Sequence, residues 1–156
     1  MVIRTKNVSS ENFKNYGYMV TMPELKPTAE GTTYKFWSDI AHYHVDGETE
    51  IGLCTVYKED QTVIASLERH RQTPEILIPI DAPFDVPVQN DGLPGSPVES
   101  FRVHIGQAVV INTNIWHGAS IPVGKKECTY FVIFRRGTPG LDVEFKDIPS
   151  VEIIAP

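Results

Sequence analysis

Short apolar runs separated by turn-forming residues recur along the whole chain. The 12 prolines and 11 glycines divide it into segments rich in Val, Ile, Thr, Tyr and Phe. Segments of about 4–8 such residues, bounded by turn formers, are typical of antiparallel strands in an all-β sandwich or barrel. We expect strands at residues 51–57, 62–67, 75–80, 101–105, 108–111 and 129–135.

Apolar and polar positions alternate most clearly between residues 101 and 105. Phe101, Val103 and Ile105 fall on one face, and Arg102 and His104 fall on the other. Because successive side chains of a strand point to opposite faces, this pattern predicts a strand with one buried face. We see no repeat, linker or low-complexity tract, so we expect a single domain over residues 1–156.

Helical periodicity is weak. The best helical segment starts at residues 9–10, where Phe13 and Tyr16 follow a capping serine and Gly17 ends the turn. A second short turn is expected at residues 148–151. Residues 81–100 carry four prolines and two glycines, which predicts a long loop that can frame a site.

Charge and composition exclude several classes of function. The 14 Lys and Arg residues against 20 Asp and Glu give a formal charge of -6. Nucleic acids and anionic membranes need a concentrated basic face, so we expect neither as a partner. The N-terminal stretch has no apolar signal-peptide core, which favours a cytoplasmic location. Cys54 and Cys128 lack zinc-site spacing and are expected as small buried hydrophobes.

Two histidine groups could carry chemistry. His42 and His44 would share one face of a strand, but Asp46, Gly47 and Glu48 follow at once and indicate a surface position. Of the pair, we expect His44 to line a pocket. The alternative for both is an exposed or packing role.

The second group is Glu68, His70 and Glu75, with His117 following a later strand. Strand alternation puts Glu68 and His70 on one side, and Glu75 can return to that side after the turn at Pro74. The pattern resembles the two motifs of cupin barrels, in which His-x-His-x3or4-Glu is followed by a Gly-rich stretch ending in His. Glu68 stands where that motif has its first histidine.

The residue types in this group suit two kinds of site. Two carboxylates and two imidazoles are a suitable donor set for a divalent ion such as Mn, Fe, Ni or Zn. Without a metal, the same four residues would form a coupled acid–base cluster with perturbed pKa values. The alternative is that Glu68 pairs with a neighbouring arginine and His70 is structural.

Four segments together resemble the bacterial ureidoglycolate lyases. LERHRQTPEILIPI (67–80) and GQAVVINTNIWHG (106–118) are the specific ones. ENFKNYG (11–17) and YFVIFRRGTPGLDVEFKDIP (130–149) agree in order and spacing. The resemblance covers most of the chain.

The resemblance implies a cupin-type antiparallel β-barrel (a double-stranded β-helix or jelly roll) with one or two short helices, forming a homodimer. It implies release of urea from (S)-ureidoglycolate, leaving glyoxylate, in the allantoin branch of purine breakdown. The small-molecule carboxylate would meet acid, base or metal-ligand groups at Glu68, His70, Glu75 and His117. We add candidate substrate contacts at His44, Arg69, Asn112 and Trp116. The alternative for Arg69 is a surface ion pair or a dimer contact. The alternative for Trp116 is a packing role.

The chain departs from the family pattern at four positions. Glu75 stands where the family usually has glutamine, Gly118 replaces a second histidine after Trp116, and Asn112 and Arg135 replace a histidine and an aspartate. These changes keep two alternatives open. One is a cupin enzyme acting on another small carboxylate or sugar acid, and the other is a non-catalytic cupin binding protein.

Overall fold

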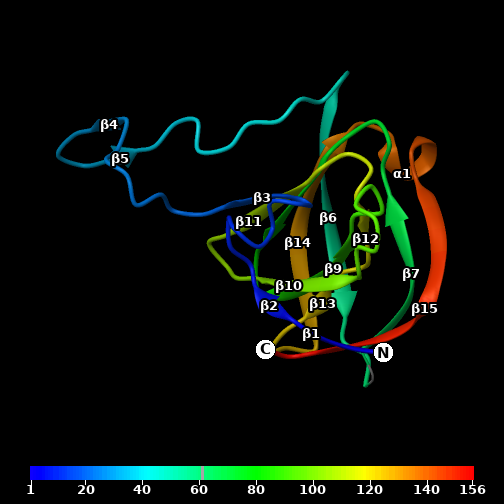
Figure 1. The fold of residues 1–156 in the computed structure, drawn as a ribbon. Coiled ribbons are helices and arrows are strands. Elements are labelled where there is room, and N and C mark those ends of the chain that lie inside the picture. The colour runs from blue at the N-terminus through cyan, green and yellow to red at the C-terminus, as the bar shows by residue number, and fades with distance from the viewer. Residues whose placement is uncertain (61) are drawn as a thin grey trace.

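Two β-sheets packed face to face form a nearly closed barrel (Figure 1). The structure is a computed structural model that describes residues 1–60 and 62–156. Its one described helix is α1 (Thr138–Leu141). The strands are β1 (Val2–Arg4), β2 (Lys6–Asn7), β3 (Gly17–Val20), β4 (Ala29–Glu30), β5 (Lys35–Phe36), β6 (Thr49–Tyr57), β7 (Val63–Arg69), β8 (Glu75–Pro79), β9 (Phe84–Gln89), β10 (Glu99–Val103), β11 (Ala108–Ile111), β12 (Trp116–His117), β13 (Ile121–Pro122), β14 (Glu127–Arg135) and β15 (Glu144–Ile154).

The larger sheet has the order β1-β15-β7-β12-β9-β10-β2, with β13 paired to β9, and the smaller has the order β3-β11-β8-β14-β6. All pairs are antiparallel except β1 with β15 and β10 with β2. The expected all-β antiparallel barrel is therefore confirmed. Each of the six predicted strands is present, with ends that differ by at most two residues.

Aromatic and β-branched side chains from both sheets fill the barrel. Phe101 and Val103 are fully buried, as the alternation predicts, whereas Ile105 lies beyond the end of β10 and is 55% exposed. The Phe101 ring meets Phe13 edge-on at 5.3 Å between centroids and lies 5.6 Å from Tyr16. Arg102, on the opposite face, forms a two-pronged ion pair with the buried Asp85. The sequence pattern thus sets which side of the sheet faces the core.

The predicted loop at residues 81–100 is wrong in its first half, which contains β9. Prolines discourage a strand assignment because they lack an N–H donor. Pro87 is tolerated because it lies opposite the gap between β12 and β13, where its carbonyl accepts a hydrogen bond from Gly118 N–H. The side chains of Phe84, Val86 and Val88 are fully buried, so packing determines this strand.

The two expected helical turns also differ from the structure. Residues 9–17 form successive turns, with Phe13 N–H donating to the Ser9 carbonyl, but no helix. Residues 148–151 lie inside β15, where the pairing with β7 shifts register. The short helix lies instead at α1, which carries a proline in its first turn.

Residues 21–48 form an arm that extends away from the barrel and carries the two-residue strands β4 and β5 (Figure 1). Several of its apolar side chains are exposed, including Leu25, Tyr34 and Phe36. Among the described residues, no helix has the length and apolar character needed to cross a membrane.

Candidate active site

Four polar side chains from three strands converge at one end of the barrel. Glu68 lies on β7, and His70 follows it directly after the strand ends. Glu75 is the first residue of β8, and His117 is the last residue of β12. Because β12 pairs with β7 in the register that sets His117 opposite Glu68, these two side chains share the inner face.

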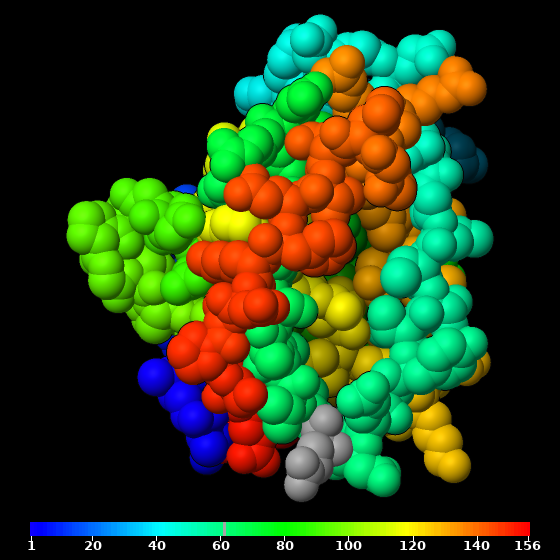
Figure 2. Space-filling view, turned by 90° about the vertical axis from the view of Figure 1, so that its right-hand side faces the viewer, coloured from blue at the N-terminus to red at the C-terminus, as the bar shows by residue number. Residues whose placement is uncertain are grey.

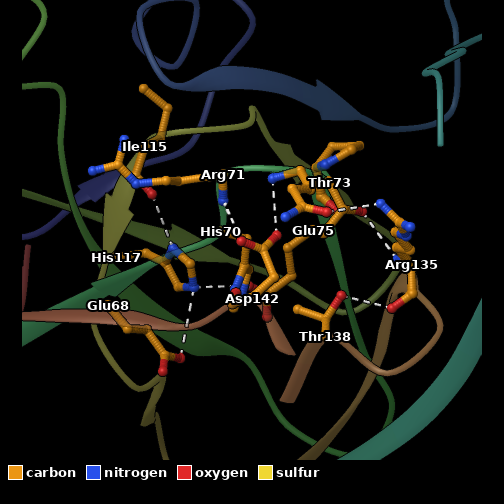
Figure 3. Close-up of polar contacts among 12 residues, drawn as sticks. Glu68, His70, Arg71, Thr73, Glu75, Ile115, His117, Arg135, Thr138 and Asp142 are labelled. Atoms are coloured by element: carbon orange, nitrogen blue, oxygen red, sulfur yellow. Dashed lines mark hydrogen bonds and ion pairs between the residues drawn. The ribbon is translucent and has the colours of Figure 1, made fainter. Parts of the chain in front are cut away.

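Glu75 lies between the two imidazoles (Figure 3). Its Oε2 atom is 3.0 Å from Nε2 of His70 and 2.7 Å from Nε2 of His117. All three residues are buried. The His117 contact is close but lacks hydrogen-bond geometry, so among the described residues no group is hydrogen-bonded to this buried nitrogen.

The other ring nitrogen of each histidine contacts a backbone carbonyl. Nδ1–H of His70 donates to the Asp142 carbonyl at 2.7 Å, and Nδ1–H of His117 donates to the Ile115 carbonyl at 3.2 Å. These bonds fix the tautomer and turn both Nε2 atoms toward Glu75. This arrangement of a carbonyl behind each imidazole is typical of metal-binding histidines.

Glu68 is the member of the group that reaches solvent. Its side chain is 34% exposed, and its Oε1 atom is 3.7 Å from Nε2 of His117. Ligand atoms of Glu68, His70 and His117 all lie within 4.8 Å of one another, which makes them a possible three-residue metal site. The Glu75 carboxylate is closer still to both histidines, so the nitrogen and oxygen donors fit a borderline divalent ion.

The charges of Glu75 and the two histidines shift one another's pKa values. Burial alone would raise the pKa of Glu75, but the charges of His117 and His70 and the hydrogen bond with His70 lower it to about 2. Burial alone would lower the pKa of His117, but the Glu75 carboxylate, aided by Glu68, raises it to about 9. Burial also lowers the pKa of His70, but the hydrogen bond and charge of Glu75 outweigh it, so the His70 pKa is raised. In the metal-free protein at neutral pH, Glu75 is therefore an anion and His117 a cation.

Asp142 positions His70, and the sequence analysis missed it. Its carboxylate accepts hydrogen bonds from the backbone N–H groups of Arg71 and Gln72, at 2.9 and 2.8 Å. These bonds tie the residue after α1 to the turn after β7, which brings the Asp142 carbonyl to the His70 ring. The two segments are about seventy residues apart in the chain, and we find no local pattern that signals the contact.

The four predicted substrate contacts lie outside this group. His44 and Asn112 line a separate surface depression of about 300 Å³ with Tyr18 and Tyr43. Trp116 is buried under Arg69, whose guanidinium carbon lies 4.2 Å from the ring centroid. Their role in binding substrate stays a prediction.

Arg69 forms the surface ion pair that was its alternative, a two-pronged contact with Glu144. Lys146 covers Trp116 as well, at 4.4 Å from the ring centroid. The indole N–H donates to Asp91 at 2.6 Å. Trp116 is therefore enclosed by a charged network on the face opposite Glu68 and His117.

Three of the four departures from the family pattern also lie outside the group. Gly118 faces away from His117, and a Cβ there would lie 3.3 Å from Pro87. Arg135 donates to the Gln72 side chain, and Asn112 is exposed. Only Glu75 changes the charge of the converging side chains.

Comparison with known sequences gives one family. The ureidoglycolate lyase family matches residues 1–153. A curated ureidoglycolate lyase of Mesorhizobium japonicum is 34% identical over 84 residues, which cover 52% of this chain and 50% of the relative. The chain thus spans about half the length of the curated relative it matches.

Solved structures give a likeness of fold. Peruvianin-I, described as a cysteine peptidase from Thevetia peruviana latex, is 11% identical with a TM-score of 0.50, over 65% of this chain and 57% of that one. The oxalate decarboxylase of Bacillus subtilis, described with Mn(II) centres, is 17% identical with a TM-score of 0.45, over 57% and 22%. At such identities these proteins indicate nothing about the reaction.

Proposed function

Because the chain belongs to the ureidoglycolate lyase family, we propose that it cleaves (S)-ureidoglycolate into urea and glyoxylate, a step in the allantoin branch of purine breakdown. The observation that carries the proposal is the Glu75 carboxylate held between two imidazoles, with the half-exposed Glu68 beside them. The matching relative in Mesorhizobium japonicum bears the name of this activity.

The reaction needs one base and one acid. Its substrate carries a hydroxyl and a ureido nitrogen on the same carbon. When the hydroxyl loses its proton, a carbonyl forms, the C–N bond breaks, and the departing nitrogen takes up a proton to give urea. Groups that move protons at these two positions supply typically about 10²–10⁴-fold in rate.

Glu68 and His117 are placed for these two roles. Glu68 has the exposed carboxylate, so it can meet the substrate hydroxyl and accept its proton. In the metal-free protein the His117 imidazolium, 3.7 Å away, is the proton donor for the leaving nitrogen. Glu75 keeps His117 protonated, and His70 holds Glu75 from the other side.

The same residues would hold a divalent metal ion, and this is the second form of the proposal. The supporting observation is the buried Nε2 of His117, which points at a carboxylate without hydrogen-bond geometry. Such an ion, when bound, supplies positive charge that stabilises a developing oxyanion. Glu68, His70 and His117 would be its ligands, with Glu75 beside both histidines as a further ligand.

The test measures urea and glyoxylate from ureidoglycolate, on one preparation before and after chelation and with Mn²⁺ restored. Release of both products supports the lyase function. Loss on chelation and recovery with Mn²⁺ would assign the four residues to a metal site, whereas unchanged activity would assign them to acid–base roles. No product from folded protein under any of these conditions would contradict the proposal and favour the other cupin functions.

We also infer a homodimer. The arm at residues 21–48 exposes Leu25 and Tyr34, and the outer face of β6 exposes Ile51 and Leu53 at 70% and 66%. A two-stranded hairpin is marginally stable in water by itself, so the arm needs a surface to pack against. In a two-fold dimer, each arm would cover the β6 face of the other copy, because such an interface is self-complementary.

A cytoplasmic location completes the proposal. Cys54 and Cys128 are both free thiols. Reducing compartments keep thiols in this state. A thiol titration of protein isolated under non-reducing conditions would test whether both remain reduced.

A further inference from the structure

A cavity of about 450 Å³ opens on the side of the barrel between β6 and β7. Figure 2 shows this side, with β7 and β15 (green and red) on one edge, β6 (teal) on the other and the yellow part of the chain between them. The lining residues are 55–57 and 59, 62–64 and 119–122. The two sheets do not pair here, so the barrel interior is accessible.

Ser120 is the unusual residue of this cavity. It is only 5% exposed, and among the described residues no group is hydrogen-bonded to its Oγ atom. A buried hydroxyl without a hydrogen-bond partner typically lowers the stability of the fold. A ligand or an ordered water in the cavity would supply the missing hydrogen bond. The hydroxyl lies close to the Tyr130 phenol, but the two do not meet with hydrogen-bond geometry.

The remaining walls indicate what kind of ligand fits. Val56, Ile64 and Ile121 are apolar, and the described lining residues include one anion, Glu59, and no cation. A carboxylate would be desolvated here without a compensating charge, which is unfavourable. A neutral amide has a smaller desolvation cost than a carboxylate when it moves from water into the cavity. It can also both donate a hydrogen bond to a hydroxyl and accept one from it.

One wall of the cavity, residues 119–122, follows the His117 end of the histidine cluster along the chain. Ser120 follows His117 by three residues. Tyr130, on β14, is near Ser120, and the charge of Glu75 contributes to raising the Tyr130 pKa. A molecule whose reacting carbon lies at Glu68 and His117 would therefore extend one of its substituents toward Ser120.

We propose that this cavity is the subsite for the neutral ureido end of the substrate and that the Ser120 hydroxyl is its specificity-determining hydrogen-bonding group. This assignment rests on the proposed lyase function. It also orients the substrate: the carboxylate lies on the side of His70 and His117, and the departing urea leaves through the opening between β6 and β7.

The experiment compares Ser120→Ala with the wild type. Two unreactive probes separate the ends of the substrate: ureidoacetate keeps the ureido group and carboxylate, and glycolate keeps the carboxylate and hydroxyl. In Ser120→Ala, calorimetry should show ureidoacetate binding weakened about 5–20-fold while glycolate binding stays within about twofold. The KM for ureidoglycolate should rise with kcat nearly unchanged.

Thr129→Val is the matched control. It removes a hydroxyl that bonds to Thr55 at 3.0 Å and that does not itself line the cavity. Binding of both probes should stay as in the wild type. The melting temperature of Ser120→Ala should equal or exceed that of the wild type, because the lost hydroxyl has no partner in the fold.

The possible outcomes are distinguishable. A wild type that releases no urea contradicts the lyase function whatever Ser120 does. If the wild type is active but Ser120→Ala has an unchanged KM and unchanged ureidoacetate binding, only the subsite assignment is overturned. Equal weakening of both probes would place the carboxylate in the cavity, and a clear fall in melting temperature would show that the hydroxyl serves the fold. Either result overturns the assignment.

Discussion

The Oε2 atom of Glu75 lies 2.7 Å from Nε2 of His117, and both side chains are buried. One is a carboxylate at the start of β8 and the other an imidazole at the end of β12, on opposite sheets. The contact therefore connects the two sheets at the site. In the metal-free protein it also makes the charge of each group depend on the other.

The first prediction concerns the titration of His117. Replacing Glu75 with glutamine keeps the shape and removes the charge that raises the His117 pKa. The pKa of His117, about 9 in the metal-free protein, should fall by at least about one unit, because burial then acts with less opposition. NMR titration of the histidine ring protons after chelation measures this. An unchanged pKa would contradict the proposed coupling.

The second prediction is a stability optimum in mild acid for the chelated protein. The His117 pKa is raised from 6.5 to about 9, so its contribution is complete below about 6.5 and is lost as the pH rises through 9. The Glu75 pKa is lowered from 4.5 to about 2, so its contribution is complete above 4.5 and is lost as the pH falls through 2. The free energy of unfolding, measured by urea denaturation, should be larger at pH 6 than at pH 9.5 by on the order of 1–3 kcal/mol. In Glu75→Gln this difference should shrink, and an equal difference there would assign the slope to other groups.

The third prediction concerns catalysis. His70→Ala and His117→Ala should each lower ureidoglycolate turnover at least about 100-fold, because each removes a group in contact with Glu75. His104→Ala is the control, since that histidine is exposed and bonds to Asn7. Circular dichroism should show that all three variants keep the β fold. Normal turnover in both site variants would mean that the reaction occurs elsewhere.

The fourth prediction concerns the dimer. Leu53→Lys places a charge on the exposed outer face of β6, where the partner's arm would pack. Light scattering after gel filtration should show a dimer for the wild type and a monomer for this variant. Leu93→Lys changes another exposed leucine, away from the arm and β6, and should stay dimeric. A wild-type monomer at micromolar concentration would contradict the inferred arm exchange.

Local pattern in the sequence was enough to predict the strands that line the site. Alternation and β-branched composition identify β6, β7, β8, β10, β11 and β14, because strand periodicity is a property of neighbouring residues. The spacing of Glu68, His70 and Glu75 also predicts a shared side, since alternation puts Glu68 and His70 on one face and the turn at Pro74 can return Glu75 to that side. The structure has all three beside His117.

Tertiary contacts decided the rest. Pro87 enters a strand only because its neighbours β12 and β13 leave a gap opposite it. Asp142 reaches His70 only because its carboxylate binds the backbone N–H groups of the turn after β7. Whether Trp116 faces the site depends on the register of β12 against β7, which turns its ring toward Arg69 and Lys146. The unpartnered Ser120 likewise depends on where the two sheets fail to pair. Each of these features depends on contacts between residues distant in the chain, and so no local pattern encodes it.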